Sequence, residues 1–187
     1  MTEVTRDDEK RQILDALGFA VEELKNKMDP RLIPEVGSNI TYALPAARSP
    51  GDVAGVEGRI VTMRGSVHPV GSCAFGASDH IARIVLTAMR FDPLIRSAAN
   101  IRFSDNLAVL LEDLSFDICW FDRNKEPPGI QTMDWGVASC CKDEVPDMIL
   151  DRGAVGKEPM IRILGPDPVS VANTIIMLSS RITTMEI

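Results

Sequence analysis

The stretch SCAFGASDHIARIVLTAMRFDP, residues 72–93, turns from a loop of small residues into an apolar helix. Apolar residues recur at helical spacing from 78 to 91, and Pro93 follows this segment. Beyond Pro93 the pattern predicts a short helix and then a strand at NIRFS, residues 100–104. Strands and helices intermingle in the same way along the rest of the chain. We therefore expect an α/β fold.

The N-terminal part supplies one long helix and several strands. Residues 6–28 carry apolar side chains at three-to-four spacing, which predicts an amphipathic helix that ends at Asp29-Pro30. SNITYAL, residues 38–44, is typical of a short strand, and RIVTMRGSV, residues 59–67, predicts a hairpin that turns near Arg64-Gly65. This half therefore adds a long helix and several strands ahead of the opening loop.

The C-terminal part continues the alternation of strands and helices. Its patterns predict strands at 116–122, 148–150 and 160–164, and helices at 107–114, 135–141 and 168–181. The segment KEPPGIQTMD, residues 125–134, is expected to be a loop because of its Pro-Pro-Gly. All linkers are short, and no internal repeat is visible. One domain over residues 1–187 is expected, with a leading helix in 1–30 and a core over 34–180.

Composition narrows the class of protein. The net charge of −7 argues against broad nucleic-acid binding, which needs a basic surface. No apolar run is long enough for a membrane span, and the charged start MTEVTRDDEKRQ resembles no signal peptide, so a cytoplasmic location is expected. The four cysteines form no CxxC pair. We expect reduced, mostly buried thiols rather than a zinc site or a disulfide framework.

The segment GASDHIAR suggests an anion site at a helix start. Ser78 or Asp79 is the expected N-cap, and the free amides beyond it lie beside Gly76 and the imidazole of His80. The positive end of the helix dipole would lower the pKa of His80 and keep it neutral. The alternative is that Ser78 merely caps the helix and His80 is an ordinary polar residue of its first turn.

The segment DRGAVGKEP, residues 151–159, resembles a phosphate loop in its chemistry. Its glycines, Gly156 among them, allow close approach of backbone to a ligand, and Arg152 and Lys157 supply positive charge beside Asp151. The GxxxxGK[ST] pattern is absent, which disfavours a nucleotide triphosphatase. The alternative is an ordinary glycine-bearing connection.

Several other polar residues are weaker candidates for the same pocket. Asn100 and Arg102 lie on one face of the predicted strand, where an amide suits the edge of a heteroaromatic ring, unless the strand simply turns this face to water. Arg59 is either an anion clamp or a solvent-facing residue, and Asn39 either lines the pocket or makes a turn. Asp122 and Asp134 are carboxylates that suit Mg²⁺ beside a diphosphate, although a solvated loop explains them more simply.

Longer segments carry a resemblance to a known family. They are PEVGSNITYALPAA (34–47), GRIV (58–61), VHPVGSCAFGASDHIARIVLTAMRFDP (67–93), AANIRFS (98–104), WGVAS (135–139) and PDMILDRGAVGKEPMIRILGPDPV (146–169). In this order they resemble the ThiN family of archaeal-type thiamine-phosphate synthases, often fused behind a hydroxymethylpyrimidine kinase. The resemblance covers about residues 34–180, which is nearly the whole chain.

The resemblance implies both a fold and a reaction. The fold is a three-layer α/β/α domain with a mixed, largely antiparallel sheet, similar to class II aldolases. The reaction joins hydroxymethylpyrimidine diphosphate to hydroxyethylthiazole phosphate and releases pyrophosphate, with Mg²⁺ expected because one substrate is a diphosphate. The catalytic arginine and histidine of the family fall on Arg59 and His80.

Two further expectations follow from the resemblance and the leading helix. Some relatives carry the domain behind a DNA-binding module and act as ligand sensors. A thiamine-phosphate-binding sensor without turnover is therefore the alternative to the enzyme, although residues 1–33 are short and acidic for such a module. The Leu and Ile stripe of the leading helix also suggests a homodimer.

Overall fold

The computed structural model describes residues 5–125, 132–142 and 144–182, with the side chains of 132–134 not described. In this part of the chain the helices are α1 (Arg6–Lys27), α2 (Asp79–Met89), α3 (Asp105–Asp113), α4 (Thr132–Cys140) and α5 (Pro168–Arg181). The strands are β1 (Ile40–Ala43), β2 (Val53–Val56), β3 (Ile60–Met63), β4 (Ser66–Pro69), β5 (Cys73–Phe75), β6 (Ser97–Arg102), β7 (Ile118–Trp120), β8 (Met148–Asp151) and β9 (Met160–Gly165).

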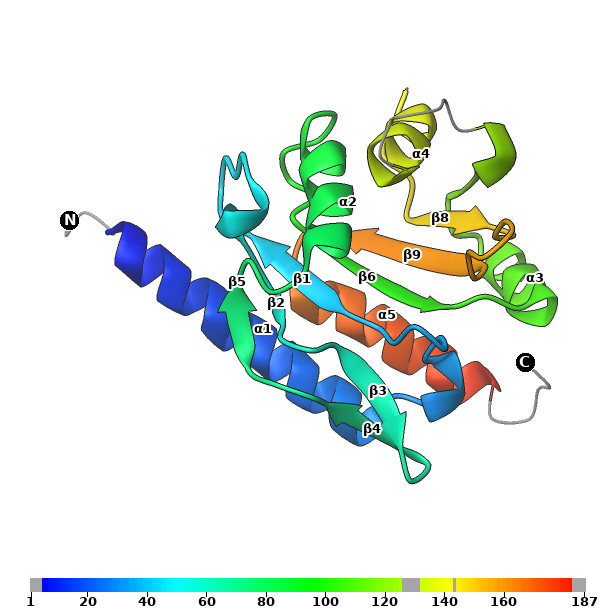
Figure 1. Ribbon diagram of the computed structural model, residues 1–187, viewed down its shortest axis with the longest axis horizontal. Coiled ribbons are helices and arrows are strands. Elements are labelled where there is room, and N and C mark those ends of the chain that lie inside the picture. Colours follow the sequence, from blue (N-terminus) through cyan, green and yellow to red (C-terminus); the bar gives the residue numbers. More distant parts are fainter. Residues whose placement is uncertain (1–4, 126–131, 143, 183–187) are drawn as a thin grey trace.

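The main sheet of the described chain has seven strands in the order β5-β2-β1-β6-β9-β8-β7. β7 and β8 run parallel, and the other neighbours run antiparallel. Residues of α1, α3 and α5 share one hydrophobic cluster with the sheet, while residues of α2 and α4 share the other. Helices therefore cover both faces (Figure 1). The expected three-layer α/β/α class with a mixed, largely antiparallel sheet is confirmed.

Helix α1 belongs to this core. Thr5 and Asp8 form a capping box at its start, and the stripe that includes Ile13, Leu17 and Leu24 is buried where α1 packs on α5 (Figure 1). The stripe that suggested a homodimer is therefore used within this chain, and the dimer loses that support. None of the helices in the described ranges is long and apolar enough to cross a bilayer.

Local sequence explains several elements directly. The hairpin β3–β4 pairs Met63 with Ser66, and the residues between them, Arg64 and Gly65, have φ of 52° and 77°. Positive φ at both central residues is the type I′ geometry that suits tight hairpins. At the other end of the chain, Asp167 caps α5 by accepting the Ser170 amide at 2.9 Å, with Pro168 in the first turn. Both predictions are confirmed.

Other local predictions are wrong. The short helix expected after Pro93 is a turn, because Asp92 Oδ1 accepts the Leu94 amide at 2.9 Å and holds the chain in a local loop. Strands β2 and β5 are short pieces that periodicity did not reveal, and β5 falls where a loop was expected. The helix expected from Trp135 begins at Thr132. Residues 126–131 of the expected loop lie outside the described residues.

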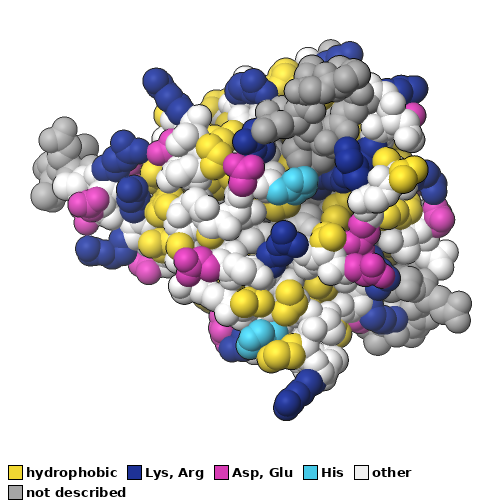
Figure 2. Space-filling model, viewed as in Figure 1, with side chains coloured by type: hydrophobic (Ala, Val, Ile, Leu, Met, Phe, Trp, Pro, Cys, Tyr) yellow, Lys and Arg dark blue, Asp and Glu magenta, His cyan; other side chains and the backbone are white. Residues whose placement is uncertain are grey.

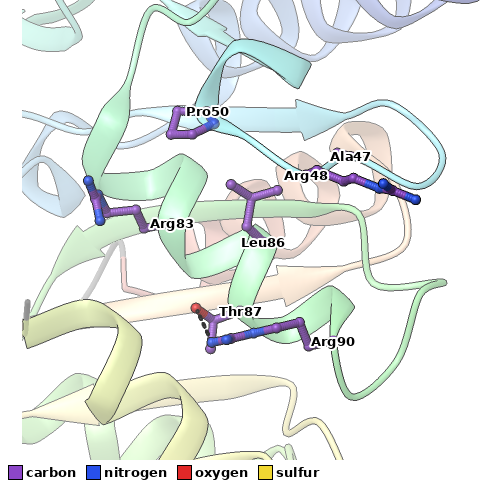
Figure 3. A pocket seen from close by; sticks show the side chains of 7 residues that line it. All are labelled: Ala47, Arg48, Pro50, Arg83, Leu86, Thr87 and Arg90. Carbon is purple, nitrogen blue, oxygen red and sulfur yellow. Dashed lines mark hydrogen bonds between the residues drawn. The ribbon is translucent and has the colours of Figure 1, made fainter.

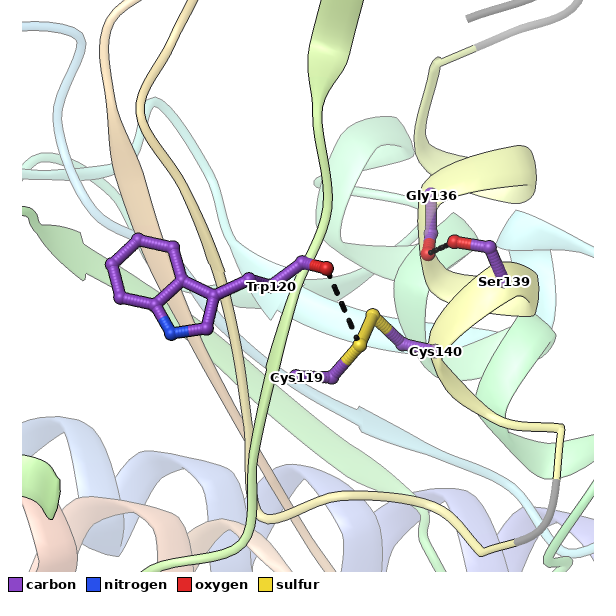
Figure 4. Close-up of a disulfide and its surroundings, with 5 residues drawn as sticks. All are labelled: Cys119, Trp120, Gly136, Ser139 and Cys140. Carbon is purple, nitrogen blue, oxygen red and sulfur yellow. Dashed lines mark hydrogen bonds between the residues drawn. A yellow bond between two sulfur atoms is a disulfide. The ribbon is translucent and has the colours of Figure 1, made fainter. Parts of the chain in front are cut away.

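The expectation of four reduced thiols is also wrong. Cys119 on β7 and Cys140 at the end of α4 form a disulfide across 21 residues of sequence (Figure 4). Sequence spacing did not reveal it because the fold alone brings this strand and helix together. Cys73 and Cys141 are free, and burial raises the pKa of Cys73 and raises that of Cys141 to about 11.

Candidate active site

A cavity of about 470 Å³ lies at the N-terminus of α2. It is lined by Val36, Ser38, Asn39, Arg59, Ala77, Ser78, Asp79, His80, Ile81, Asn100 and Met160. On the face shown in Figure 2, basic side chains lie on several sides of a histidine. The fold thus brings five of the predicted site residues to one place: Asn39, Arg59, Ser78, His80 and Asn100. We call this hollow the His80 cavity.

The start of α2 offers hydrogen-bond donors to this cavity. Ser78 is the N-cap residue, but within the described structure its side chain makes no capping hydrogen bond. By contrast, Ser104 at the start of α3 accepts the Leu107 amide at 3.1 Å. Gly76, at φ +75°, lies in the loop that leads into the helix. The first amides of α2 and the Ser78 hydroxyl are thus placed for an anionic ligand.

His80 is neutral at physiological pH. Desolvation by the surrounding protein, followed by the positive charges of Arg162, Arg123 and Arg59, lowers its pKa to about 4. The side chain still stands at the exposed rim of the cavity. The expected direction of the shift is therefore found, with burial and three arginines as its causes rather than the helix dipole alone. A neutral imidazole offers one hydrogen-bond donor and one acceptor.

Arg59 is held in an unusual backbone conformation. Its φ is +78°, in the left-handed region that residues other than glycine rarely adopt, and Gly58 before it has φ +67°. The guanidinium Nη1 donates to the carbonyl of Val36, which fixes the side chain along the cavity wall. Backbone strain of this kind is concentrated at functional sites because the surrounding fold must sustain it.

Asn39 and Asn100 line the cavity but use their polar atoms to hold the fold. Asn39 Nδ2 donates to the Val56 carbonyl at 2.8 Å, and its Oδ1 accepts the amides of Ile40 and Val56, each at 2.9 Å. Asn100 Oδ1 accepts the Asn39 amide at 2.8 Å, and its Nδ2 donates to the Gly37 carbonyl at 3.0 Å. These amides therefore shape the wall of the cavity.

Sequence reasoning missed Ser38. This residue is 4% exposed, and among the described residues its hydroxyl oxygen has no hydrogen-bond partner. Ser38 is fixed by a backbone bridge in which its amide donates to Ile60 and its carbonyl accepts from Ile60. A buried hydroxyl without a partner is costly unless a ligand or water completes it. The only signal in the sequence was its place between Gly37 and Asn39.

A second omission is Arg162, whose signal was a single arginine inside the apolar strand MIRIL. Its side chain is fully buried, and its Nη1 donates to Asp151 Oδ2 at 2.6 Å. Arg123 Nε lies 2.7 Å from Asp151 Oδ1, outside hydrogen-bond alignment. Asp151, predicted to help bind phosphate, is therefore the carboxylate that holds two arginines. We call these three residues the arginine cluster.

A larger cavity of about 650 Å³ includes Arg123 in its lining. It is lined by Trp120, Phe121, Asp122, Arg123, Asn124, Lys125, Trp135, Ser139, Arg152 and Gly153. Arg152 pairs with Asp105 at 2.6 Å and lies over the rings of Phe103 and Trp120. Arg152 therefore belongs to this aromatic cavity rather than to the His80 cavity.

Three predicted residues lie elsewhere. β6 ends at Arg102, whose exposed side chain lines a separate hollow of about 240 Å³ beside Pro34 and Thr62. Gly156 and Lys157 form the exposed tip of the 151–159 loop and do not figure among the described residues that line the His80 cavity. Loop chemistry predicted phosphate binding for Gly156 and Lys157, and strand alternation left Arg102 facing either the pocket or water, but neither signal places a residue at a particular cavity.

The described residues hold no group of three His, Cys, Asp or Glu side chains that suits a resident metal ion. Asp79 is the carboxylate on the wall of the His80 cavity, and it pairs with Arg83 at 2.7 Å. Asp122 lies in the aromatic cavity and accepts from Asn124 at 2.9 Å. The Asp134 side chain is outside the described residues. A single carboxylate suits Mg²⁺ only together with phosphate oxygens from a ligand.

A third hollow, of about 430 Å³, lies on the outer side of α2 and carries Arg48, Arg83 and Arg90. Figure 3 shows that these side chains point apart instead of toward one centre. Arg83 is paired with Asp79, and Arg90 Nη2 lies 3.4 Å from Thr87 Oγ1. The three arginines of this hollow therefore do not converge on one ligand position.

Comparison with known proteins gives consistent results. The family described as thiamine-phosphate synthase ThiN matches residues 16–177. The chain is 44% identical over 179 residues to the bifunctional thiamine biosynthesis protein ThiDN of Methanocaldococcus jannaschii, covering 94% of this chain but 42% of that protein. It is 37% identical over 154 residues to the thiamine-phosphate synthase ThiN of Methanothermobacter thermautotrophicus, covering 79% of this chain and 81% of that protein.

Solved structures agree with the family and the fold. A crystal structure of the C-terminal domain of a phosphomethylpyrimidine kinase is 44% identical, with a TM-score of 0.84 over 91% of this chain and all of that one. The L-fuculose-1-phosphate aldolase of Thermus thermophilus is 14% identical, with a TM-score of 0.50 over 94% of this chain and 95% of that one. The second likeness bears on the fold alone, and it confirms the class II aldolase-like architecture.

Proposed function

Because the chain belongs to the thiamine-phosphate synthase ThiN family, we propose that it joins hydroxymethylpyrimidine diphosphate to hydroxyethylthiazole phosphate. In this reaction the bond from the pyrimidine methylene carbon to the diphosphate oxygen breaks, and its electron pair leaves with pyrophosphate. The lone pair of the thiazole nitrogen forms the new carbon–nitrogen bond, which gives thiamine phosphate. The reaction therefore develops negative charge on one group, the departing diphosphate.

The observation that carries the proposal is the convergence of donors on the His80 cavity. Arg59, the first amides of α2 and the Ser38 and Ser78 hydroxyls all meet there. Donors fixed before the reaction stabilise developing charge more than they stabilise the bound substrate. They therefore suit a reaction whose barrier depends on stabilising a departing diphosphate.

His80 adds a neutral donor beside the same leaving group. With its pKa lowered to about 4, the ring carries one N–H at neutral pH and donates it to a diphosphate oxygen. As charge builds on that oxygen, the proton affinity of the imidazole rises, because a nearby anion favours the charged form of histidine. His80 thus helps the leaving group to depart as a hydrogen-bond donor, and it acts as a general acid only after the bound diphosphate has raised its pKa and the second ring nitrogen has taken up a proton.

The aromatic cavity suits the second substrate. Trp120 and Trp135 offer flat apolar faces, and Arg152 and Lys125 offer positive charge beside them. An aromatic ring with a phosphate arm needs both features. We assign this cavity to the thiazole phosphate, and Arg152→Gln is expected to raise the KM for this substrate more than the KM for the pyrimidine diphosphate.

We propose that Mg²⁺ binds together with the diphosphate substrate. The ion would neutralise part of the charge on the phosphate oxygens when bound. Asp79 is the carboxylate that the His80 cavity offers to it. We expect chelation to stop turnover and Asp79→Asn to raise the Mg²⁺ concentration needed for half-maximal rate.

The decisive experiment is pyrophosphate release from the purified protein with both substrates and Mg²⁺. Arg59→Ala and His80→Ala are each expected to lower the rate, the former by about 10²–10³-fold, as for loss of one donor to a developing anion. Arg48→Gln, an exposed arginine of the hollow in Figure 3, is the matched control and is expected to keep the wild-type rate. Tight binding of thiamine phosphate without turnover would contradict the enzyme and identify a sensor.

Location and assembly complete the proposal. A biosynthetic role supports a cytoplasmic location, small-molecule substrates and no nucleic-acid partner, which cell fractionation and ligand screening test. A disulfide in that compartment is common in hyperthermophiles and rare elsewhere. A homodimer would need a surface other than the buried stripe of α1, and light scattering decides whether it forms.

A further inference from the structure

The arginine cluster is more than a structural ion pair. Arg162 on β9 and Asp151 are both fully buried, and Arg123 is nearly so, at 7% side-chain exposure. One carboxylate faces two guanidinium groups, so the cluster carries a net positive charge inside the protein. A buried charge that is not neutralised is costly, and proteins rarely keep one without a partner or a ligand.

The hydrogen bonds within the cluster leave part of Arg162 open. Its Nη1 donates to Asp151, but Nε and Nη2 have no hydrogen-bond partner among the described residues. Asp151 does not accept a hydrogen bond from either of these groups, because its Oδ1 accepts the Gly153 amide at 2.8 Å and faces Arg123. Two fixed N–H donors on one buried guanidinium match the paired oxygens of a phosphate group.

The packing around Arg162 fixes where those donors lie. The guanidinium stands 5.3 Å from the ring centroid of Phe121, and Phe121 is in turn held against Gly136 of α4. A Cβ at position 136 would come within 2.7 Å of that ring, so only glycine lets α4 close on it. Arg162 therefore rests on a fixed platform instead of adapting freely.

The cluster neighbours residues that line both cavities. Arg162 faces Asn100 across the β6–β9 pair and follows Met160 by two residues on the same strand face, and both of these line the His80 cavity. At its other end, Arg123 lines the aromatic cavity. The positive charge of Arg162 also lowers the pKa of His80, which agrees with a short distance between them.

We propose that Arg162, held by Asp151 and accompanied by Arg123, binds phosphate oxygens of the diphosphate substrate and of released pyrophosphate. This rests on the proposed function for the identity of the ligand. Arg59 and α2 then hold the diphosphate from the rim of the His80 cavity, while Arg162 holds it from the side of its strand neighbours Asn100 and Met160. Because Arg162 is already desolvated, its hydrogen bonds to the anion require little further loss of water.

A purely structural role makes a different prediction. If Arg162 served only to neutralise Asp151, a lysine at this position would keep the charge and preserve the function. A lysine lacks the planar fork, so it cannot replace Nε and Nη2 while its ammonium faces Asp151. Arg162→Lys thus separates the two roles.

The test is calorimetric titration of the full chain with inorganic pyrophosphate, with and without Mg²⁺. Arg162→Lys is expected to unfold near the wild-type temperature but to bind pyrophosphate at least about tenfold more weakly, as expected for loss of a charge-assisted hydrogen bond. The KM of Arg162→Lys for the diphosphate substrate should rise as its affinity for pyrophosphate falls. Arg48→Gln is the matched control, with affinity unchanged. A folded Arg162→Lys protein with wild-type pyrophosphate affinity would overturn the proposal.

Two further measurements keep the result decisive. If Arg162→Lys does not fold, Arg123→Gln is titrated in its place, since Arg123 lies in the short η3 turn (Arg123–Lys125). In addition, the Nε–H resonance of Arg162 is followed by NMR while the wild-type protein is titrated with pyrophosphate. A resonance that does not move at saturating pyrophosphate overturns the proposal. If pyrophosphate binding depends on Arg162 but the protein forms no thiamine phosphate, only the proposed function is contradicted. If the protein forms thiamine phosphate but its pyrophosphate binding does not depend on Arg162, only the present inference is contradicted.

Discussion

Two groups of buried polar side chains lie near the His80 cavity, and they differ in how their hydrogen bonds are satisfied. On one side, Asn39 and Asn100 direct their amide groups at backbone groups of neighbouring segments. On the other side, the arginine cluster keeps two donors of Arg162 without a partner in the described structure. Asn100 and Arg162 are paired across β6 and β9, so neighbouring buried side chains differ in whether the described protein completes their hydrogen bonds.

The comparison distinguishes groups that build a site from groups that await a ligand. A buried amide with every partner in place stabilises one arrangement of strands and gains nothing from a ligand. A buried guanidinium with open donors lowers the stability of the empty protein and gains when an anion arrives. Stability measured with and without pyrophosphate therefore separates the two groups.

The largest effect is expected from Asp151→Asn. This change removes the negative charge between Arg123 and Arg162 while keeping the shape of the side chain, and breaking a buried pair costs about 3–5 kcal/mol of unfolding free energy. Asn39→Ala should cost less, about 1–3 kcal/mol, because it leaves neutral groups without partners. Urea denaturation measures both losses.

Added pyrophosphate is expected to affect the stability of these two variants differently. An anion that binds the folded protein stabilises it by mass action, and it should stabilise Asp151→Asn more than Asn39→Ala because it supplies the missing negative charge. Equal stabilisation of both variants would mean that the anion does not approach the arginine cluster.

The second prediction concerns the covalent link on the side of the arginine cluster. The disulfide Cys119–Cys140 ties β7 to α4 (Figure 4). Gly136 of this helix lies against the ring of Phe121. Opening a loop of this length should lower the free energy of unfolding by about 3 kcal/mol. Thermal unfolding with and without dithiothreitol measures the change, and Cys119→Ser with Cys140→Ser should reproduce it without reductant. An unchanged midpoint would show that the thiols are reduced already.

The sequence predicted the parts of the fold that depend on local pattern. The stripe of α1, the start of α5 at Pro168 and the Arg64-Gly65 turn are each determined within a few residues, so periodicity and turn chemistry were enough. β5 has three residues and no such pattern. The Cys119–Cys140 link depends on where β7 and α4 meet in the fold.

The site divides in the same way. Ser78 and His80 were predicted at one helix start from the segment GASDHIAR, and the resemblance to relatives paired Arg59 with His80, since nothing in the spacing requires Arg59 to meet them. The arginine cluster joins three segments of sequence, and its only local signal was an arginine in an apolar strand. Charged residues of a strand are usually assigned to solvent, and only the packing of α4 and β8 shows that Arg162 is buried.

The smallest effect is expected from the titration of His80. The pKa of this residue in the folded protein is about 4, below its ordinary value of 6.5, so between these values the unfolded chain binds a proton that the folded chain does not. The free energy of unfolding should therefore fall as the pH decreases through this window. Part of the imidazole is exposed, so the loss is smaller than for a fully buried ring.

The same titration tests which side of the cavity the anion occupies. Bound pyrophosphate would offset the charges of Arg59, Arg123 and Arg162, so the pKa of His80 should rise toward 6.5. The imidazole C–H resonances report this shift, and since the chain has two histidines, His80→Gln assigns them by difference. A pKa that stays near 4 at saturating pyrophosphate would mean that the anion binds away from the three arginines. The comparison between the two groups of buried side chains would then have to be explained without a ligand.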